Sequence, residues 1–382
     1  MYQLTRYLYE LSEVKGNLIM ALLNKDNKQA LFWAFEYYYS GYPYEVVNYI
    51  IQIFYDFYYV LNHTYEKYMF IQLKKVSLEN ENEDLAIFIK LMLDNLIYRP
   101  YTLDVFLLRN MGLQFEVDFE SIENINEEIN SLLLEHDNYV YLSTIIMQHK
   151  NFQNKNELEK LHSIVIDTMS KFIKINKNVK MKETKVLLDN CYEDEIVLKR
   201  TIILAKIINY YSIKLNVKTH RSVYVENNVE EQIRELNKYK TKHPSKLNEN
   251  ALYASNEQSL IGIFRLERFK KENKDYKKKY LLNWEYYAYD LPYWTTLFAL
   301  YGADKNELQQ KIIFKDEENE DDFYENINYF PDEETSEIQN KSIGNIEKIC
   351  NLKQFCDKYG GKNIIQIEEQ YITDLDQIEF VI

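Results

Sequence analysis

Apolar side chains in the first 110 residues recur at the three- and four-residue spacing of a buried helix face. One run extends from Leu4 to Leu22, a broader one occupies 46–61, and another covers 84–98. Each run is long enough for several helical turns, and the links between them are short. The pattern therefore predicts successive antiparallel helices over 1–110, arranged as a helical bundle or as an array of helix pairs.

Residues that favour helix ends lie between these runs. Asp26 with Gln29 three positions later matches a capping box, so a second helix is expected to begin there. Gly41 suits the left-handed residue that ends a helix, and Pro43 suits the first turn of the next one. A fourth helix is expected to follow His63.

Beyond residue 110 the pattern is less regular but remains mostly helical. Two segments alternate apolar and polar residues and are predicted as short strands, 115–119 and 217–225. Helices are expected at 121–135, 137–149, 156–175, 182–190, 194–213, 257–271, 276–290, 293–301 and 345–359. The predicted fold class is therefore mainly α, with a second helical region after the N-terminal bundle and at most a few short strands.

The same pattern divides the chain into five ranges. These are an N-terminal helical bundle over 1–110, a mixed and mostly helical region over 111–240, a basic and aromatic helical region over 241–315, an acidic flexible segment over 316–340, and a C-terminal helix and tail over 341–382.

The net charge of −14 is concentrated in one of these ranges. Residues 316–340 carry 11 carboxylates and no Lys or Arg, which leaves −14 + 11 = −3 for the other 357 residues. The body of the protein is therefore nearly neutral, and 316–340 is predicted to be a solvated and mobile segment. It lacks the glycine and the ligand spacing of a calcium loop.

The chain is expected to be soluble and intracellular. Cys191, Cys350 and Cys356 form no C-x-x-C pair, which suits a reducing compartment. The N-terminus does not resemble a signal peptide. The most apolar windows, 46–61 and 85–98, contain charged residues and favour core helices over membrane spans.

No motif assigns a catalytic, cofactor or metal site. The six histidines have no metal-ligand spacing to one another or to a cysteine. Phosphate-loop, dinucleotide, nucleophile-elbow, zinc-protease and kinase motifs are all missing from the sequence. No catalytic residue, cofactor or metal is therefore predicted, and an enzyme whose site is assembled from distant residues stays open as a third interpretation.

One basic segment adjoins aromatic residues. Residues 265–279 hold eight Lys or Arg against three acids, and aromatic residues, among them Trp284 and Trp294, follow. Cations beside stackable rings suit single-stranded nucleic acid, whereas a solvated Lys face above a buried aromatic face is the structural alternative. The candidate nucleic-acid contacts are Arg265, Arg268, Lys270, Lys271, Lys277, Lys278 and Lys279.

Two blocks of the sequence resemble a known group of proteins. Residues 7–15 and 30–41, the latter reading Ala-Leu-Phe-Trp-Ala-Phe-Glu-Tyr-Tyr-Tyr-Ser-Gly, are similar to uncharacterised proteins of nucleocytoplasmic large DNA viruses of protists. A later block, residues 283–294, is similar to a downstream block of the same proteins. The resemblance covers about a quarter of the chain and rests on aromatic packing signatures. It implies a virus-encoded protein of the host cytoplasm or viral factory, with packaging in the virion left open.

The favoured function is a viral structural or assembly protein that acts by protein–protein contact with viral or host partners and without catalysis. Abundant aromatic residues suit interface anchors, and the acidic 316–340 segment suits a basic partner or another copy of the chain. The alternative is a nucleic-acid-associated factor of viral transcription or RNA processing that uses residues 265–294.

Overall fold

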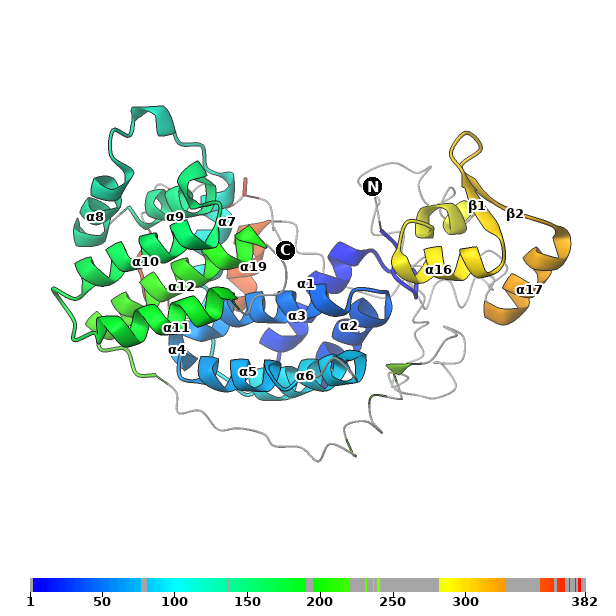
Figure 1. Cartoon of the computed structure of the whole chain (residues 1–382), viewed down its shortest axis with the longest axis horizontal. Coiled ribbons are helices and arrows are strands. Elements are labelled where there is room, and N and C mark those ends of the chain that lie inside the picture. The colour runs from blue at the N-terminus through cyan, green and yellow to red at the C-terminus, as the bar shows by residue number, and fades with distance from the viewer. Residues whose placement is uncertain are drawn as a thin grey trace.

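The computed structural model is mainly α-helical, and one two-stranded antiparallel sheet is its only sheet among the residues described, which confirms the predicted fold class (Figure 1). The residues that the structure describes are 3–76, 81–135, 138–189, 195–219, 231, 236, 239–240, 282–327, 351–360, 363–367, 371, 375 and 377–378.

The N-terminal part is a set of packed helices joined by short links, as the apolar periodicity predicts. They are α1 (Leu11–Leu23), α2 (Asn27–Tyr39), α3 (Pro43–Ile53), α4 (Tyr59–Asn62), α5 (Tyr65–Leu73) and α6 (Glu81–Leu96). A π-helical turn over Phe54–Tyr58 joins α3 to α4 without a break in the helix. The predicted caps are confirmed: Asp26 accepts a hydrogen bond from the Gln29 backbone N–H at 3.1 Å, and Pro43 lies in the first turn of α3.

The predicted start of the first helix is wrong. Leu4 and Glu10 form an isolated antiparallel bridge, and α1 begins only at Leu11. The apolar periodicity continues back to Leu4 because Leu4 and Leu8 are buried, but they pack in a second hydrophobic core and not on the face that α1 buries. Leu8 has a φ of 58°, outside the helical range.

The middle of the chain adds further helices to the same body. They are α7 (Asp104–Gln114), α8 (Ile125–Glu135), α9 (Tyr139–Gln148), α10 (Lys155–Met169), α11 (Lys177–Asp189) and α12 (Ile196–Lys214). The predicted strand at 115–119 is wrong: this segment is a loop that leads into a 3₁₀ turn over Phe119–Ser121, with Phe115 and Phe119 packed against the core. In the predicted strand at 217–225, residues 217–219 form no strand and the others lie outside the described residues.

Helix α12 lies at the centre of the helical body, by which we mean α1–α12 with a later helix, α19 (Leu352–Tyr359). Every residue from Leu198 to Ser212 is buried, and α12 contacts α3, α4, α7, α9 and α10. A helix that is buried on all sides must be surrounded by others. One core extends from α1 to α19, so the predicted boundary at residue 110 does not separate two cores.

Helix α19 returns the chain to the body, and its predicted end at Gly360 is confirmed. Its bounds are shorter than the predicted 345–359, of which 345–350 lie outside the described residues. Phe355 packs on Phe106, with ring centroids 4.9 Å apart, and the Asp104 carboxylate accepts the backbone N–H of Ile364 at 2.8 Å. These contacts hold α19 and Ile364 against α7.

A second, smaller unit lies at the right of Figure 1 and is called the distal unit, residues 282–327. Its elements are a helical segment at 282–288, α16 (Pro292–Leu300), β1 (Ala303–Asn306), β2 (Lys311–Phe314) and α17 (Glu317–Ile327). The two strands pair with Ala303 opposite Phe314 and Asn306 opposite Lys311, a hairpin that the sequence analysis did not predict.

Residues 317–327 of the acidic segment form a helix, α17, which the sequence did not predict. Phe323 and Ile327, one turn apart, are buried in the core of the distal unit. Asp316 accepts a hydrogen bond from the Asn319 backbone N–H at 2.9 Å, which caps the helix. The remaining residues, 328–340, lie outside the described part of the chain.

Candidate functional site

The two tryptophans of the predicted nucleic-acid site are buried. Trp284 and Trp294 are each 1% exposed, and their rings meet edge to face with centroids 5.1 Å apart. The Trp294 indole N–H donates to the Thr5 carbonyl at 3.0 Å. Neither ring is accessible to a nucleic-acid base, so these two tryptophans follow the structural alternative of a buried aromatic face, which counts against base stacking here. The seven predicted basic contacts, Arg265, Arg268, Lys270, Lys271, Lys277, Lys278 and Lys279, lie outside the described residues.

These tryptophans belong to the joint between the distal unit and the helical body. At the joint, the buried Glu36 carboxylate accepts the Arg6 Nε–H and the Tyr7 backbone N–H, both at 2.9 Å. Gly41, with a φ of 101°, approaches Pro292 so closely that an added Cβ would lie 2.5 Å from the proline Cβ. The N-terminal segment thereby connects both cores, and the distal unit is attached through buried contacts.

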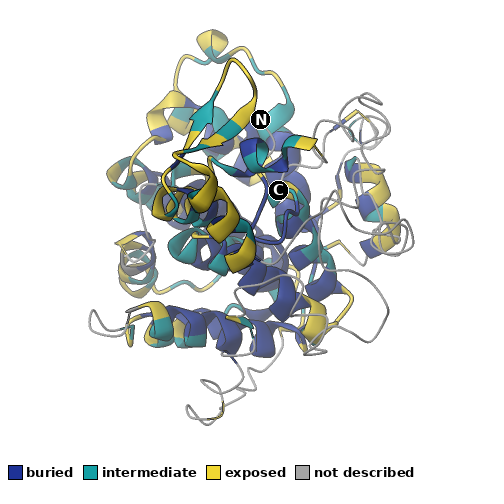
Figure 2. Ribbon diagram, turned by 90° about the vertical axis from the view of Figure 1, so that its right-hand side faces the viewer, coloured by how far each residue is buried: buried dark blue, intermediate teal, exposed yellow. Residues whose placement is uncertain are grey.

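The outer surface of the distal unit combines apolar and acidic side chains. Figure 2 looks onto this unit and shows exposed residues over the hairpin and α17. Leu300 is 73% exposed and Leu308, in the hairpin turn, is 98% exposed. The exposed carboxylates of α17 are Glu317, Glu318, Glu320, Asp321, Asp322 and Glu325, and no Lys or Arg occurs in the helix.

The buried side of α17 fixes which way these carboxylates point. The Phe323 ring stacks on Phe298 with centroids 5.0 Å apart, and the Tyr324 hydroxyl donates to Glu285 at 2.6 Å. Residues 318, 321 and 325 lie on the opposite face of a helix with 3.6 residues per turn. Packing of the apolar face thus turns an acidic face toward solvent.

A polar network lies inside the helical body, where sequence reasoning did not look for one. The Lys206 ammonium contacts the Glu66 carboxylate at 3.1 Å and the Tyr59 hydroxyl at 3.1 Å, and the Tyr55 hydroxyl donates to Glu66 at 2.9 Å. The four groups satisfy one another, so the network holds α12 to the preceding helices.

His162 lies beside this network on α10. Its Nε2 is 3.0 Å from the Tyr210 hydroxyl, and its Nδ1 has no hydrogen-bond partner among the described residues. Burial, with a smaller contribution from Lys206 and Lys180, lowers the pKa of His162 to about 3. The imidazole is therefore neutral at physiological pH and has a structural role. Because only the unfolded state gains a proton on acidification, the folded state loses stability at low pH.

A buried ion pair joins the π-helical turn to α7. Arg109 Nε lies 3.0 Å and 3.1 Å from the two carboxylate oxygens of Asp56. Burial raises the pKa of Asp56 above its ordinary value, against the opposing effect of Arg109. The sequence carried a signal for this pair, since Asp56 is a lone charge within an apolar stripe.

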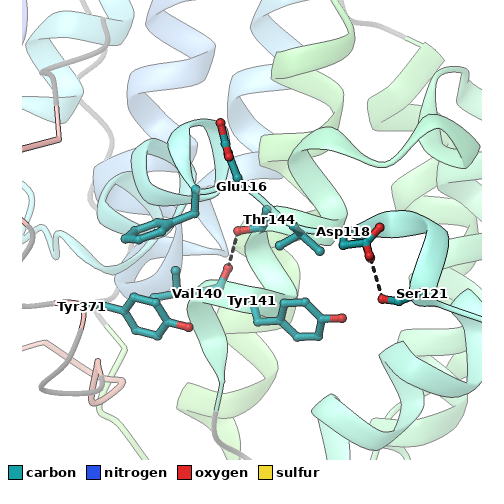
Figure 3. Close-up of a pocket in the computed structure, with 9 residues that line it drawn as sticks. Glu116, Asp118, Ser121, Val140, Tyr141, Thr144 and Tyr371 are labelled. Atoms are coloured by element: carbon teal, nitrogen blue, oxygen red, sulfur yellow. Dashed lines mark hydrogen bonds between the residues drawn. The ribbon is translucent and has the colours of Figure 1, made fainter.

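A pocket of about 390 Å³ opens on the helical body between the 115–121 loop, α9 and Tyr371 (Figure 3). Its lining includes two carboxylates, Glu116 and Asp118, and the aromatic rings of Phe115, Tyr141 and Tyr371. Among the residues that the structure describes, the lining contains no Lys or Arg. A second pocket of about 300 Å³ lies near the joint. It is lined by both Glu83 and Lys240, so its lining favours neither cationic nor anionic ligands.

Within the described ranges, no three His, Cys, Asp or Glu side chains are grouped to hold a metal ion, and no helix is long and apolar enough to cross a membrane. Comparison of the chain with models of protein families, with curated proteins and with solved structures finds no match.

Proposed function

We propose that this chain is a virus-encoded structural or assembly protein that acts by protein–protein contact and not by catalysis, in the host cytoplasm or viral factory and in the assembled particle. The observation that carries the proposal is the outward face of α17, where carboxylates are held in a fixed array on an attached unit. Exposed Leu300 and Leu308 on the same unit add apolar contact area.

The partner that fits this face is a basic protein surface. Residues 265–279 of the chain carry a net charge of +5, from eight basic and three acidic residues. We propose that this segment of a second copy is the occupant. A contact between two different patches of one chain is heterologous, so it builds rings or extended assemblies, as an assembly protein requires. The resemblance of residues 7–15, 30–41 and 283–294 to viral proteins supports the viral setting.

The test is sedimentation velocity of the full chain at low and at high salt. The wild-type protein is expected to self-associate at low salt and to dissociate as salt screens the contact. The triple variant Glu318→Gln/Asp321→Asn/Glu325→Gln is expected to associate about tenfold more weakly. Deletion of 316–340 is a poor test, because it removes Phe323 and Ile327 from a core.

The matched control neutralises three exposed carboxylates elsewhere, in Glu120→Gln/Glu123→Gln/Glu127→Gln. Both variants reduce the net charge of −14 equally, which by itself weakens repulsion between copies and favours association. Weaker association of the α17 variant alone therefore identifies α17 as the contact. A monomeric wild-type protein at every salt concentration, or equal behaviour of the two variants, contradicts the proposal.

Quantitative mass spectrometry of purified virus particles tests the particle assignment separately. Many copies per particle support a structural role in the virion, and absence from particles removes that part of the proposal.

The nucleic-acid alternative makes a different prediction for the same proteins. It requires salt-sensitive binding of a single-stranded oligonucleotide that weakens when Lys277, Lys278 and Lys279 are neutralised and that is unchanged in the α17 variant. The burial of Trp284 and Trp294 counts against the nucleic-acid alternative, because two of the rings that it needs for base stacking are inaccessible.

A further inference from the structure

The 390 Å³ pocket of Figure 3 lies on the helical body, beside α9 and the loop that follows α7. Figure 3 shows the rings of Tyr141 and Tyr371 along one side of the pocket and Glu116 and Asp118 along the other. The third ring, Phe115, meets Tyr371 edge to face with centroids 5.1 Å apart. The pocket therefore offers aromatic rings and carboxylates within one small concave space.

Three hydroxyl groups of the described lining already donate their protons within the protein. The Ser121 hydroxyl donates to the Asp118 carbonyl at 2.7 Å, and the Thr144 hydroxyl donates to the Val140 carbonyl at 2.9 Å. The Tyr141 hydroxyl is hydrogen-bonded to the Glu128 carboxylate outside the lining. Each of these protons is already used within the protein, so hydroxyl lone pairs and carboxylate oxygens remain for a ligand.

The surrounding sequence strengthens the negative potential. Residues 110–149 contain eight carboxylates and no Lys or Arg, and the pocket lies in the middle of this stretch. The net charge of the whole chain does not reveal this local concentration of carboxylates. A cleft lined by one sign of charge concentrates ligands of the opposite sign.

We propose that this pocket binds an organic cation of the guanidinium class. A guanidinium group carries five N–H donors and no acceptor, which complements the Glu116 and Asp118 carboxylates and the hydroxyl lone pairs of the lining. Its planar shape also stacks on aromatic rings and pairs with a carboxylate through two parallel hydrogen bonds, whereas an ammonium is a compact, strongly hydrated point charge. The volume falls in the range of small-ligand sites. The inference is independent of the proposed contact through α17.

The test is isothermal titration calorimetry of the full chain with Nα-acetyl-arginine methylamide, whose only charge is the guanidinium. The neutral isostere, Nα-acetyl-citrulline methylamide, is the ligand control and is expected to bind about tenfold more weakly or not at all. The corresponding lysine compound is expected to bind more weakly than the arginine compound. Absence of binding by the arginine compound at about 10 mM, or equal binding of arginine and citrulline, overturns the proposal.

Variants locate the binding to the pocket. Glu116→Gln and Tyr141→Leu are each expected to weaken binding of the arginine compound about threefold to fivefold. The matched control is Glu123→Gln, an exposed carboxylate of the same acidic stretch that does not line the pocket. Because Glu116 is exposed, Glu116→Gln should not disturb folding, which an unchanged denaturation midpoint checks. Equal weakening by Glu116→Gln and Glu123→Gln would mean a diffuse field and would overturn the assignment.

A final comparison identifies the source of the guanidinium. A capped Gly-Gly-Arg-Gly-Gly peptide that binds as tightly as the single residue identifies an arginine side chain of a partner protein. A peptide that fails to bind, while the single residue binds, identifies a free small molecule. Either result supports the guanidinium pocket.

Discussion

Charged side chains that interrupt the apolar runs of the helical body are paired inside it. Lys90 and Asp94, one turn apart on α6, form a buried ion pair at 2.6 Å, and Asp56 finds Arg109 on α7. A buried charge is costly unless it is paired. In the sequence, such residues favour core helices over membrane spans. The sequence does not indicate the partner of Asp56, which lies 53 positions away.

Neutral His162 makes the protein sensitive to acid. Its pKa is about 3 in the folded state and near 6.5 when unfolded. Between these values only the unfolded state binds the proton, so stability is complete above about pH 6.5 and falls as the pH decreases toward 3. We expect the free energy of unfolding of the wild type to fall between pH 6 and pH 5 more steeply than that of His162→Gln, by about 1 kcal/mol per pH unit.

Urea denaturation at a series of pH values measures this difference. The comparison of slopes is independent of any constant loss of stability in the variant. Other groups, including His63 and His149, whose pKa values burial also lowers, are present in both proteins and cancel. Parallel stability profiles of wild type and variant would show that His162 is not the group responsible.

At the scale of elements, α7 and α9 pack closely at Gly112. A Cβ added at Gly112 would lie 2.6 Å from the Ser143 Oγ and 2.8 Å from the Ser143 backbone carbon. Helix propensity alone predicts that Gly112→Ala stabilises the protein. The contact predicts the opposite sign, a loss of about 1–3 kcal/mol, because α9 must move.

The denaturation midpoint in urea, with an unchanged dependence on denaturant, measures that loss. A higher urea midpoint in Gly112→Ala would show that α9 moves without loss of stability and would contradict the prediction. The sequence offers no sign of the contact, since the residue that meets Gly112 lies 31 positions further along the chain.

At the scale of the whole molecule, the N-terminal segment connects two cores. Leu8 is buried in the core of the distal unit, whereas Leu18 is buried in the core of the helical body. We expect Leu8→Ala to leave a cavity and to loosen the distal unit by about 2–5 kcal/mol, because its core is small. Hydrogen exchange should then accelerate in 284–327 and stay unchanged in α9–α12.

Leu18→Ala is the matched control, with the same side-chain truncation in the other core. It is expected to accelerate exchange in the helical body and to leave the distal unit unchanged. The same protection pattern in both variants would indicate that the two cores unfold together.

Local patterns are enough to predict the mainly helical class and several helix ends, because apolar spacing and caps such as Asp26 depend only on neighbours along the chain. What those patterns pack against is set by the arrangement of the helices in space. Leu4 and Leu8 continue a helical spacing but enter a second core, and Phe115 and Phe119 alternate like a strand but lie in a loop.

The same division applies to the candidate sites. Composition located the acidic residues of 316–340, but only packing of Phe323 and Ile327 forms α17 and orients its carboxylates outward. The pocket joins Glu116, Tyr141 and Tyr371, residues separated by up to 255 positions. No local sequence pattern predicts this contact. Contacts between residues far apart in the sequence depend on how whole helices pack and not on the neighbours of each residue along the chain.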